Sequence, residues 1–216
     1  MKYKVLLFDF DGTLVDSMST FVSVMLRILE ENDIGYGEDI VKTITPLGYA
    51  GTANYFIQLG LDLPQQEIIK IMYDYAKQDY ALHIPAKDHV ISTLQILKAN
   101  GCGLNILTAS PHEMLDPCLK RLGIYELFDN VWSSDDFCTT KSNPVIYQRA
   151  AEQLNVTVGE ILFLDDNYHA VVSAKNANLK VCGVFDSSSV EYEDEIRSAS
   201  DYYLRDFSEL LDLMEP

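Results

Sequence analysis

The sequence is poor in cysteine and in positive charge. Its four cysteines, Cys102, Cys118, Cys138 and Cys182, are scattered and form no Cys-x-x-Cys pair. This pattern speaks against a zinc site or a disulfide framework and is typical of reduced thiols, so we expect a cytoplasmic protein. Lysine and arginine number 16 against 33 aspartate and glutamate residues, a formal net charge of -17. Such a surface repels nucleic acid and anionic membranes, and we expect neither as a partner.

Long apolar runs and repeats are also missing. The apolar run near the N-terminus reaches Asp9 within a few residues, so we expect neither a signal peptide nor a membrane span. No internal repeat, low-complexity tract or evident linker interrupts the 216 residues. That length suits one core domain with a small insertion. The oligomeric state cannot be read from the sequence, and a monomer is compatible with it.

What the sequence does contain is an acidic turn after a buried strand. Val5–Phe8 is continuously apolar, which is typical of a strand buried on both faces, and Asp9-Phe10-Asp11-Gly12-Thr13 follows it. Asp9 and Asp11 are two residues apart, so their side chains leave an extended chain on the same side. Gly12 lets the chain turn sharply. The two carboxylates should therefore face one point, unless this is only an acidic turn after an edge strand.

Residues 15–85 show helical periodicity and no convincing strand. Apolar residues recur at spacings of three and four after Ser17, and Pro64 suits the first position of a long helix. The helices expected here run from Ser17 to near Gly35, over Glu38–Ile44, over Thr52–Leu59 and from Pro64 to near Pro85, with a loop over Thr45–Gly51.

Residues 86–216 alternate strand and helix instead. The strands expected here are Leu104–Leu107, Asn130–Ser133, Ile161–Leu164, Lys180–Val184 and the short Tyr202–Leu204. The helices expected here are Asp88–Asn100, Pro111–Leu122, Pro144–Leu154, a segment ending near Asn178, and Phe207–Met214. Pro117 should kink or split the second of these helices.

This alternation predicts an α/β fold, a doubly wound parallel sheet with helices on both faces. We assign residues 1–14 and 86–216 to this core and residues 15–85 to an inserted, all-helical cap domain. Ligands of such sheets bind beyond the carboxyl ends of the strands. The cap leaves the core directly after the first strand, so we expect it over that edge, with the loop around Thr45–Asn54 facing the site.

Three more polar groups stand at element ends of the core. Thr108, Ala109 and Ser110 follow the second strand, and Thr108 or Ser110 could equally cap the next helix. Lys141 precedes a helix, where a solvated surface lysine would be the plain interpretation. Asp165 and Asp166 end the buried strand Ile161–Leu164, just as Asp9 and Asp11 follow the first strand.

These four blocks, in this order, resemble the four motifs of the haloacid dehalogenase superfamily over nearly the whole chain. The similarity is to its phosphatase branch, with the phosphoglycolate phosphatases and β-phosphoglucomutases, and implies a Rossmann-like core with a cap. Ala174-Lys175-Asn176-Ala177-Asn178 resembles a segment that follows the fourth motif, and counting back from it makes Asp166 the principal acidic metal ligand. Ser142 replaces a proline of the third motif. Ala170 stands where many relatives carry another acid, so Asp165 is the candidate second ligand.

A divalent metal also follows from charge alone. Two carboxylates about 4 Å apart repel each other by about 4 kcal/mol at an effective dielectric constant of about 20. Four aspartates that converge on one edge need more positive charge than Lys141 supplies. Mg²⁺ fits best, because it binds through one or two carboxylates while keeping water and substrate phosphate.

The resemblance implies a mechanism and a set of roles. Asp9 is the nucleophile that forms an aspartyl-phosphate, and Asp11 is the general acid and base. Thr108 and Lys141 are catalytic groups that share the phosphoryl charge. The implied metal ligands are the Asp9 side chain, the Asp11 carbonyl, Asp166 and Asp165, and the implied phosphate-binding residues are Gly12, Thr108, Ala109, Ser110 and Lys141.

The expected function is Mg²⁺-dependent hydrolysis of a small phosphorylated metabolite, and two alternatives remain. A phosphomutase of the β-phosphoglucomutase type has a similar fold and cap, but such mutases carry a histidine on the first cap helix where this chain has Phe21. A non-catalytic phosphate-binding regulatory protein would not need the intact set of motif residues. Asp11 disfavours a dehalogenase, which lacks this second aspartate. His169 lies close to the fourth motif and receives no role.

Overall fold

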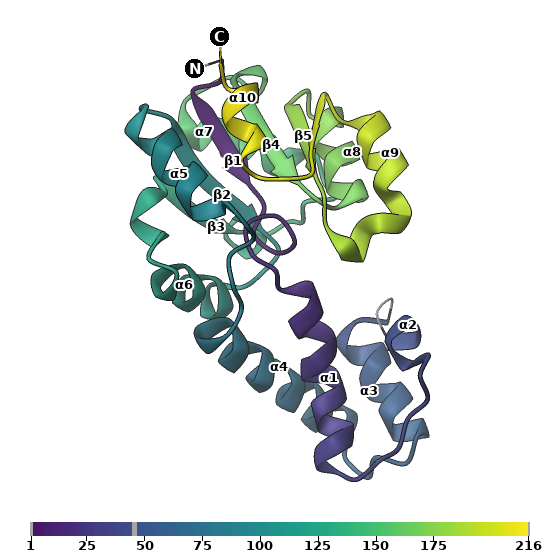
Figure 1. The fold of residues 1–216 in the computed structure, drawn as a ribbon. Helices are drawn as coiled ribbons and strands as arrows, with labels where there is room; N and C mark the ends of the chain where they lie inside the picture. The colour runs from purple at the N-terminus through teal and green to yellow at the C-terminus, as the bar shows by residue number, and fades with distance from the viewer. Residues whose placement is uncertain (1, 45–46, 216) are drawn as a thin grey trace. The chain divides into compact units, whose positions relative to one another are not determined.

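The computed structural model describes residues 2–44 and 47–215. The chain forms two compact units, one of residues 1–16 with 85–216 and one of residues 17–84. The first unit contains the sheet, and the second is helical (Figure 1). We describe each unit by itself.

The core of the first unit is a sheet whose described strands all run parallel. Its order is β3-β2-β1-β4-β5-β6, so β1 is central and the chain changes direction across the sheet between β1 and β4. This confirms the predicted doubly wound α/β core. The strands are β1 Val5–Phe8, β2 Gly103–Thr108, β3 Asn130–Ser133, β4 Ile161–Asp165, β5 Lys180–Val184 and β6 Tyr202–Leu204.

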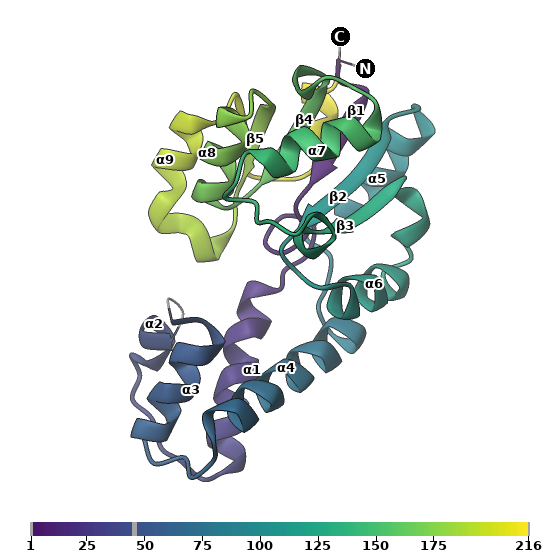
Figure 2. The same cartoon turned by 180° about the vertical axis from the view of Figure 1, so that it is seen from behind.

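Helices cover both faces of this sheet, because β1 is apolar on both. On one face Leu7 packs in a cluster with Tyr147, Val171 and residues of α9. On the other, the Phe8 ring lies 6.3 Å from Phe128 and 6.0 Å from Phe207. Figure 1 shows α5 and α10 in front of the sheet, and Figure 2 shows α7 in front of it. The core helices are α5 Val90–Ala99, α6 His112–Arg121, α7 Val145–Leu154, α8 Tyr168–Asn176, α9 Glu193–Ala199 and α10 Glu209–Leu213, with short 3-10 turns η2 Tyr125–Leu127, η3 Ser134–Phe137, η4 Val158–Glu160 and η5 Ser187–Tyr192.

Pro117 does not split its helix, contrary to that part of the expectation. Helix α6 runs through it from His112 to Arg121. A proline at this position removes the hydrogen bond to the carbonyl four residues earlier, and its ring crowds that carbonyl. The helix buries Leu115 and Cys118 on either side of the proline, and that packing outweighs the lost bond.

In its described residues, the helical unit packs four helices around an apolar cluster of its own. They are α1 Met18–Glu31, α2 Ile40–Ile44, α3 Gly48–Gln58 and α4 Gln65–Leu82. The apolar faces of these helices meet in a cluster that includes Ile28, Phe56 and Met72. The predicted loop over Thr45–Gly51 is wrong for Gly48–Gly51, which form the first turn of α3, while Thr45 and Pro46 lie outside the described residues. Burial of the α3 face outweighs the turn preference of the glycines.

The two connections to the helical unit are paired inside the sheet unit. Val15 and Ala86 form an antiparallel bridge. The Asp16 amide donates to the Pro85 carbonyl at 3.0 Å, and the Lys87 amide donates to the Leu14 carbonyl at 3.0 Å. The chain therefore leaves the sheet unit and returns to it at adjacent, hydrogen-bonded points.

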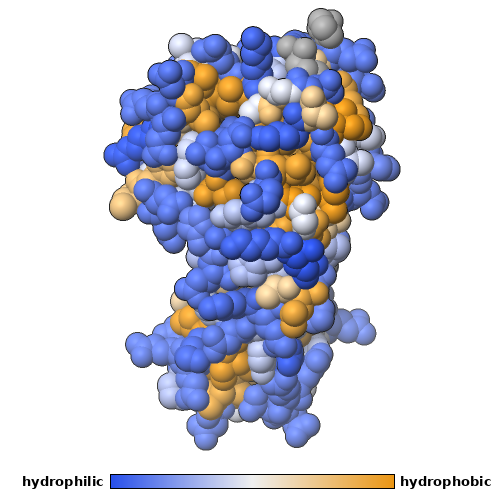
Figure 3. Space-filling model, turned by 90° about the vertical axis from the view of Figure 1, so that its left-hand side faces the viewer, coloured by the Kyte–Doolittle hydropathy of each residue, from blue (hydrophilic) through white to orange (hydrophobic). Residues whose placement is uncertain are grey.

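Much of the surface is hydrophilic (Figure 3). On the face in Figure 3, hydrophilic side chains surround the separate apolar patches. No helix in the described part of the chain is long and apolar enough to cross a membrane.

Candidate active site

The site begins where β1 and β4 end side by side. Phe8 pairs with Leu164, and the Asp9 amide then donates to the Leu164 carbonyl at 2.9 Å. This hydrogen bond extends the pairing of β1 with β4 by one residue, so Asp9 lies beside Asp165 and Asp166. Asp9, Asp165 and Asp166 are all buried, and each offers an oxygen within 4.8 Å of the others. Three sequence-predicted carboxylates thus converge, as the shared strand edge required.

Lys141 places its ammonium group between two of these carboxylates. Its Nζ lies 2.6 Å from Asp9 Oδ1 and 2.8 Å from Asp165 Oδ2. Burial acts to lower the pKa of this lysine, but Asp165 and Asp9 raise it above the ordinary value. The group therefore stays charged. The Tyr147 hydroxyl, which is buried on α7, donates to the Lys141 carbonyl at 3.0 Å and fixes the backbone there.

One lysine does not neutralise this cluster, and burial disfavours the ionised form of its carboxylates. Burial raises the pKa of Asp9 to about 7 despite the opposing effect of Lys141. Burial, followed by the charges of Asp165 and Asp9, also raises the pKa of Asp166 well above its ordinary value. Lys141 Nζ, 2.6 Å from Asp9 Oδ1, offsets only part of this negative charge. Two buried carboxylates whose charged forms are disfavoured, beside a third, fit a divalent cation with oxygen ligands.

Asp166 is held against the turn that follows Asp11. Thr13 Oγ1 donates to Asp166 Oδ1 at 3.1 Å. Gly12 has a φ of +74°, and a Cβ there would lie 2.5 Å from Asp166 Oδ2. Glycine is therefore required twice, for the left-handed backbone and for the close approach of the carboxylate. The structure places the predicted Gly12 under Asp166.

Asp165 has a different set of contacts from its neighbour. Its Oδ2 accepts from Lys141, and its Oδ1 accepts from the Asn167 amide at 2.7 Å. Both oxygens are thus engaged by the protein. Asp165 lies in the cluster that could hold a metal, and its direct contacts orient Lys141.

Asp11 is positioned by the turn after β2. Ser110 Oγ donates to Asp11 Oδ2 at 2.5 Å. The Ser110 amide donates to Thr108 Oγ1 at 3.1 Å, so the Thr108 hydroxyl shapes this turn. Neither side chain caps α6, whose N-cap is Pro111 and has no side-chain hydrogen bond. Ala109 is exposed at the tip of the turn.

His169 and Phe21, which the sequence analysis considered for a role, have structural roles outside the carboxylate cluster. His169 is exposed at the start of α8, and its amide donates to Asn167 Oδ1, so it serves the helix start. Phe21 is partly buried in the helical unit, where its ring lies 5.4 Å from that of Tyr49. Phe21 is a packing residue.

Three residues support the site in ways that the sequence analysis missed. Thr13 belongs to the first motif, but its bond to Asp166 spans 153 positions. Lys87 donates to the Gly12 carbonyl at 2.7 Å and contacts Asp186 at 3.1 Å. Only the pairing of the connections and the end of β5 bring Lys87 and Asp186 to this turn, and no local pattern shows that.

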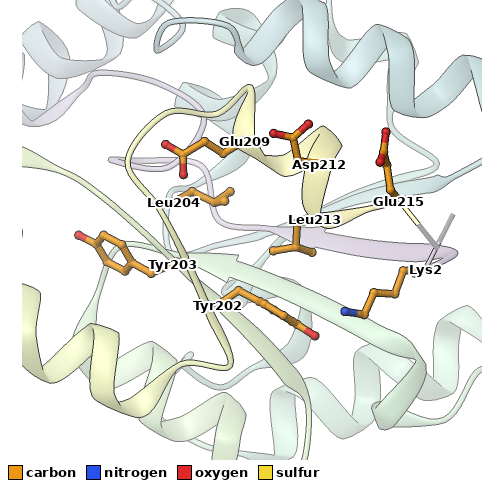
Figure 4. Close-up of a pocket in the computed structure, with 8 residues that line it drawn as sticks. All are labelled: Lys2, Tyr202, Tyr203, Leu204, Glu209, Asp212, Leu213 and Glu215. Atoms are coloured by element: carbon orange, nitrogen blue, oxygen red, sulfur yellow. The ribbon is translucent and has the colours of Figure 1, made fainter.

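A cavity of about 610 Å³ lies away from these carboxylates. Lys2 precedes β1 and Tyr202 begins β6, so the cavity lies at the amino ends of the strands (Figure 4). The Lys2 ammonium lies 4.9 Å from the centre of the Tyr202 ring. The lining residues are Lys2, Tyr202, Tyr203, Leu204, Glu209, Asp212, Leu213 and Glu215. Its position excludes it from the cluster chemistry.

Comparison with known proteins identifies the family of this chain. The sequence pattern of the family described as haloacid dehalogenase-like hydrolase matches residues 6–184. The chain belongs to the haloacid dehalogenase-like hydrolase family. A protein from Halalkalibacterium halodurans, named pyrophosphatase PpaX, is 29% identical over 99% of this chain and 98% of its own length. A phosphoglycolate phosphatase from Colwellia psychrerythraea is 28% identical over 96% of this chain and 95% of its own.

The fold of this haloacid dehalogenase-like hydrolase is also that of solved structures. A Thermotoga maritima structure, described as a candidate β-phosphoglucomutase, matches 98% of both chains with a TM-score of 0.85 at 22% identity. That identity shows the fold alone. Together with the named relatives, the family match makes the chain an enzyme of the phosphatase kind.

Proposed function

We propose that this chain is a Mg²⁺-dependent phosphatase that hydrolyses a small phosphorylated metabolite through an aspartyl-phosphate on Asp9. The observation that carries the proposal is the convergence of Asp9, Asp165 and Asp166 around Lys141, with Asp11 two residues beyond Asp9. A nucleophile, a separate acid and a charged group for phosphoryl oxygens are the parts that this chemistry needs.

In the proposed first step, an Asp9 carboxylate oxygen attacks phosphorus. The bond from phosphorus to the leaving oxygen breaks, and Asp11 donates its proton to that oxygen. The Ser110 hydroxyl, bonded to Asp11 Oδ2, orients the acid. General acid catalysis of this kind contributes about 10²–10⁴-fold. Lys141, which stays charged, contacts the phosphoryl oxygens as well as Asp9.

In the proposed second step, Asp11 removes a proton from water. That water attacks the phosphorus of the aspartyl-phosphate, the bond to Asp9 breaks, and inorganic phosphate leaves. The side chains of Asp9 and Asp166, the Asp11 carbonyl and, as a further candidate, Asp165 would hold Mg²⁺. Bound there, Mg²⁺ would neutralise carboxylate charge and polarise a phosphoryl oxygen. Gly12, Thr108, Ala109 and Ser110 form the turns proposed to receive the phosphate.

We propose the helical unit of residues 17–84 as the cap that selects the substrate. The names of the relatives supply first candidates, a phosphorylated two-carbon acid and pyrophosphate. The packing of Phe21 against Tyr49 favours hydrolysis over phosphoryl transfer to a sugar, because a phenyl ring cannot exchange protons.

Phosphate release from a panel of substrates tests this proposal. The panel holds phosphoglycolate, pyrophosphate, β-glucose 1-phosphate and an aryl phosphate, each with Mg²⁺ or with a chelator. We expect Mg²⁺-dependent release that Asp9→Asn lowers by at least about 10³-fold while the far-UV circular dichroism stays unchanged. Release that survives Asp9→Asn would refute the nucleophile. No release from any member would favour the non-catalytic alternative.

Phosphorus NMR of the β-glucose 1-phosphate reaction separates phosphatase from mutase. We expect inorganic phosphate as the product, without a bisphosphate activator. Accumulation of the 6-phosphate isomer without matching phosphate release would instead establish the mutase.

A further inference from the structure

Lys87 uses its ammonium group entirely inside the sheet unit. Its Nζ donates to the Gly12 carbonyl at 2.7 Å, to the Phe185 carbonyl at 2.5 Å and to Asp186 Oδ2 at 3.1 Å. A lysine has three N–H donors, so these three acceptors account for all of them. The Lys87 side chain is 20% exposed and Asp186 is 4% exposed. This arrangement fixes backbone groups and leaves no donor for a ligand.

Of the three acceptors, the Gly12 carbonyl is the one that connects Lys87 to the carboxylate cluster. The Gly12 carbonyl belongs to the peptide that joins Gly12 to Thr13. Thr13 Oγ1 donates to Asp166 Oδ1, and a Cβ on Gly12 would lie 2.5 Å from Asp166 Oδ2, so both residues of this peptide adjoin the carboxylate. A rotation of this peptide would therefore move the Thr13 hydroxyl that holds Asp166 and the backbone next to the carboxylate.

The far side of Lys87 is also fixed. Asp186 Oδ1 accepts from the Ser188 amide at 2.9 Å and from the Ser188 hydroxyl at 2.6 Å. Asp186 follows β5, and Lys87 is tied to Leu14 through its own amide. The ammonium thus connects the end of β5 to the turn after β1.

From this chain of contacts we propose that Lys87 is a positioning residue that holds the Gly12-Thr13 peptide, and through Thr13 the Asp166 carboxylate, in the geometry that binds the metal. The inference rests on the proposed function, because it takes Asp166 as a Mg²⁺ ligand. Lys87 acts through the backbone and touches neither substrate nor metal.

An electrostatic role and a positioning role of Lys87 predict opposite changes in Mg²⁺ affinity when the lysine is replaced. Removing a positive charge makes the site more negative, so a purely electrostatic role predicts tighter Mg²⁺ binding in Lys87→Met. Positioning predicts weaker binding, and loss of a group that orients a metal ligand typically costs about 10–100-fold in affinity. A merely structural role predicts a lower melting temperature with unchanged Mg²⁺ affinity.

The test is calorimetric Mg²⁺ titration of the full chain without substrate. We expect about tenfold weaker binding for Lys87→Met. The matched control is Lys98→Met, which removes a lysine paired with Asp129 at 2.5 Å in the same unit and should change affinity less than about twofold. Unchanged or tighter binding in Lys87→Met would overturn the inference.

A double-mutant cycle tests the route through Thr13. Thr13→Val alone should weaken Mg²⁺ binding, and Lys87→Met should then add less than about threefold, because both changes release the same carboxylate. Additive effects would show that Lys87 does not act through Thr13. If Lys87→Met does not fold, Lys87→Gln, which keeps one amide donor, enters the same cycle with the same criteria. A wild-type chain that binds no Mg²⁺ would refute the proposed function and this inference together, whereas a failed cycle on a Mg²⁺-binding wild type refutes the inference alone.

Discussion

Gly12→Ala is the substitution whose effect on the site the structure defines most directly. The added Cβ would lie 2.5 Å from Asp166 Oδ2 and 2.7 Å from its Cγ, whereas ordinary contacts begin at 3.4 Å. The carboxylate must therefore retreat by about 1 Å, and a misplacement of about 1 Å can lower turnover by about 10²-fold. Alanine at a φ of +74° also costs about 1–2 kcal/mol of folding free energy.

Gly123→Ala is the matched control for this substitution. Gly123 has a φ of +71°, and nothing lies within 4 Å of a Cβ built there. Gly123→Ala should therefore lose about 1–2 kcal/mol of folding free energy in urea denaturation, and Gly12→Ala at least as much. Only Gly12→Ala should lose Mg²⁺ affinity in calorimetry and about 10²-fold in kcat/KM. Wild-type Mg²⁺ affinity in a folded Gly12→Ala protein would refute the placement of Asp166 over Gly12.

Three other predictions follow from the contacts of the cluster. Asp166→Asn should weaken Mg²⁺ binding in calorimetry more than Asp165→Asn, because both Asp165 oxygens already accept hydrogen bonds; the reverse order would make Asp165 the main ligand. Tyr147→Phe should lower kcat more than it raises KM, because the Lys141 carbonyl loses its donor, and an unchanged kcat would contradict this role. Burial raises the pKa of Asp9 from 3.8 to about 7. Because this buried carboxyl must ionise as the pH rises from 4 to 7, the free energy of unfolding of the metal-free protein should fall by up to about 4 kcal/mol. Mg²⁺ should therefore stabilise the protein against urea more at pH 8 than at pH 5, and equal stabilisation would contradict it.

The part of the site that the sequence predicted rests on strand ends. Asp9, Asp165 and Asp166 could be placed together because each follows a continuously apolar strand, and parallel strands bring their carboxyl ends to one edge. The helical character of the residues between Ser17 and Ile84 also followed from periodicity alone. These features are local in the chain, so one sequence suffices to find them.

The remaining parts depend on contacts between distant residues. The Ser110 bond to Asp11 requires the register between β1 and β2, which apolar periodicity does not define. The Lys87 bond to Gly12 spans 75 positions, and a lone lysine near a proline resembles any surface lysine. The first turn of α3 was missed because its glycines favour turns, while the burial that orders it comes from other helices.

The pairing of the two connections has a consequence for how this chain could have arisen. Asp16 and Pro85 are joined by a hydrogen bond of 3.0 Å, so the ends of residues 17–84 lie together in the sheet unit. A loop of a few residues could close the same gap at low cost in chain entropy. The sheet and its carboxylates can thus persist while the inserted segment is lengthened, shortened or exchanged, and, with the segment as the proposed cap, such an exchange would change the substrate while the carboxylates stay in place.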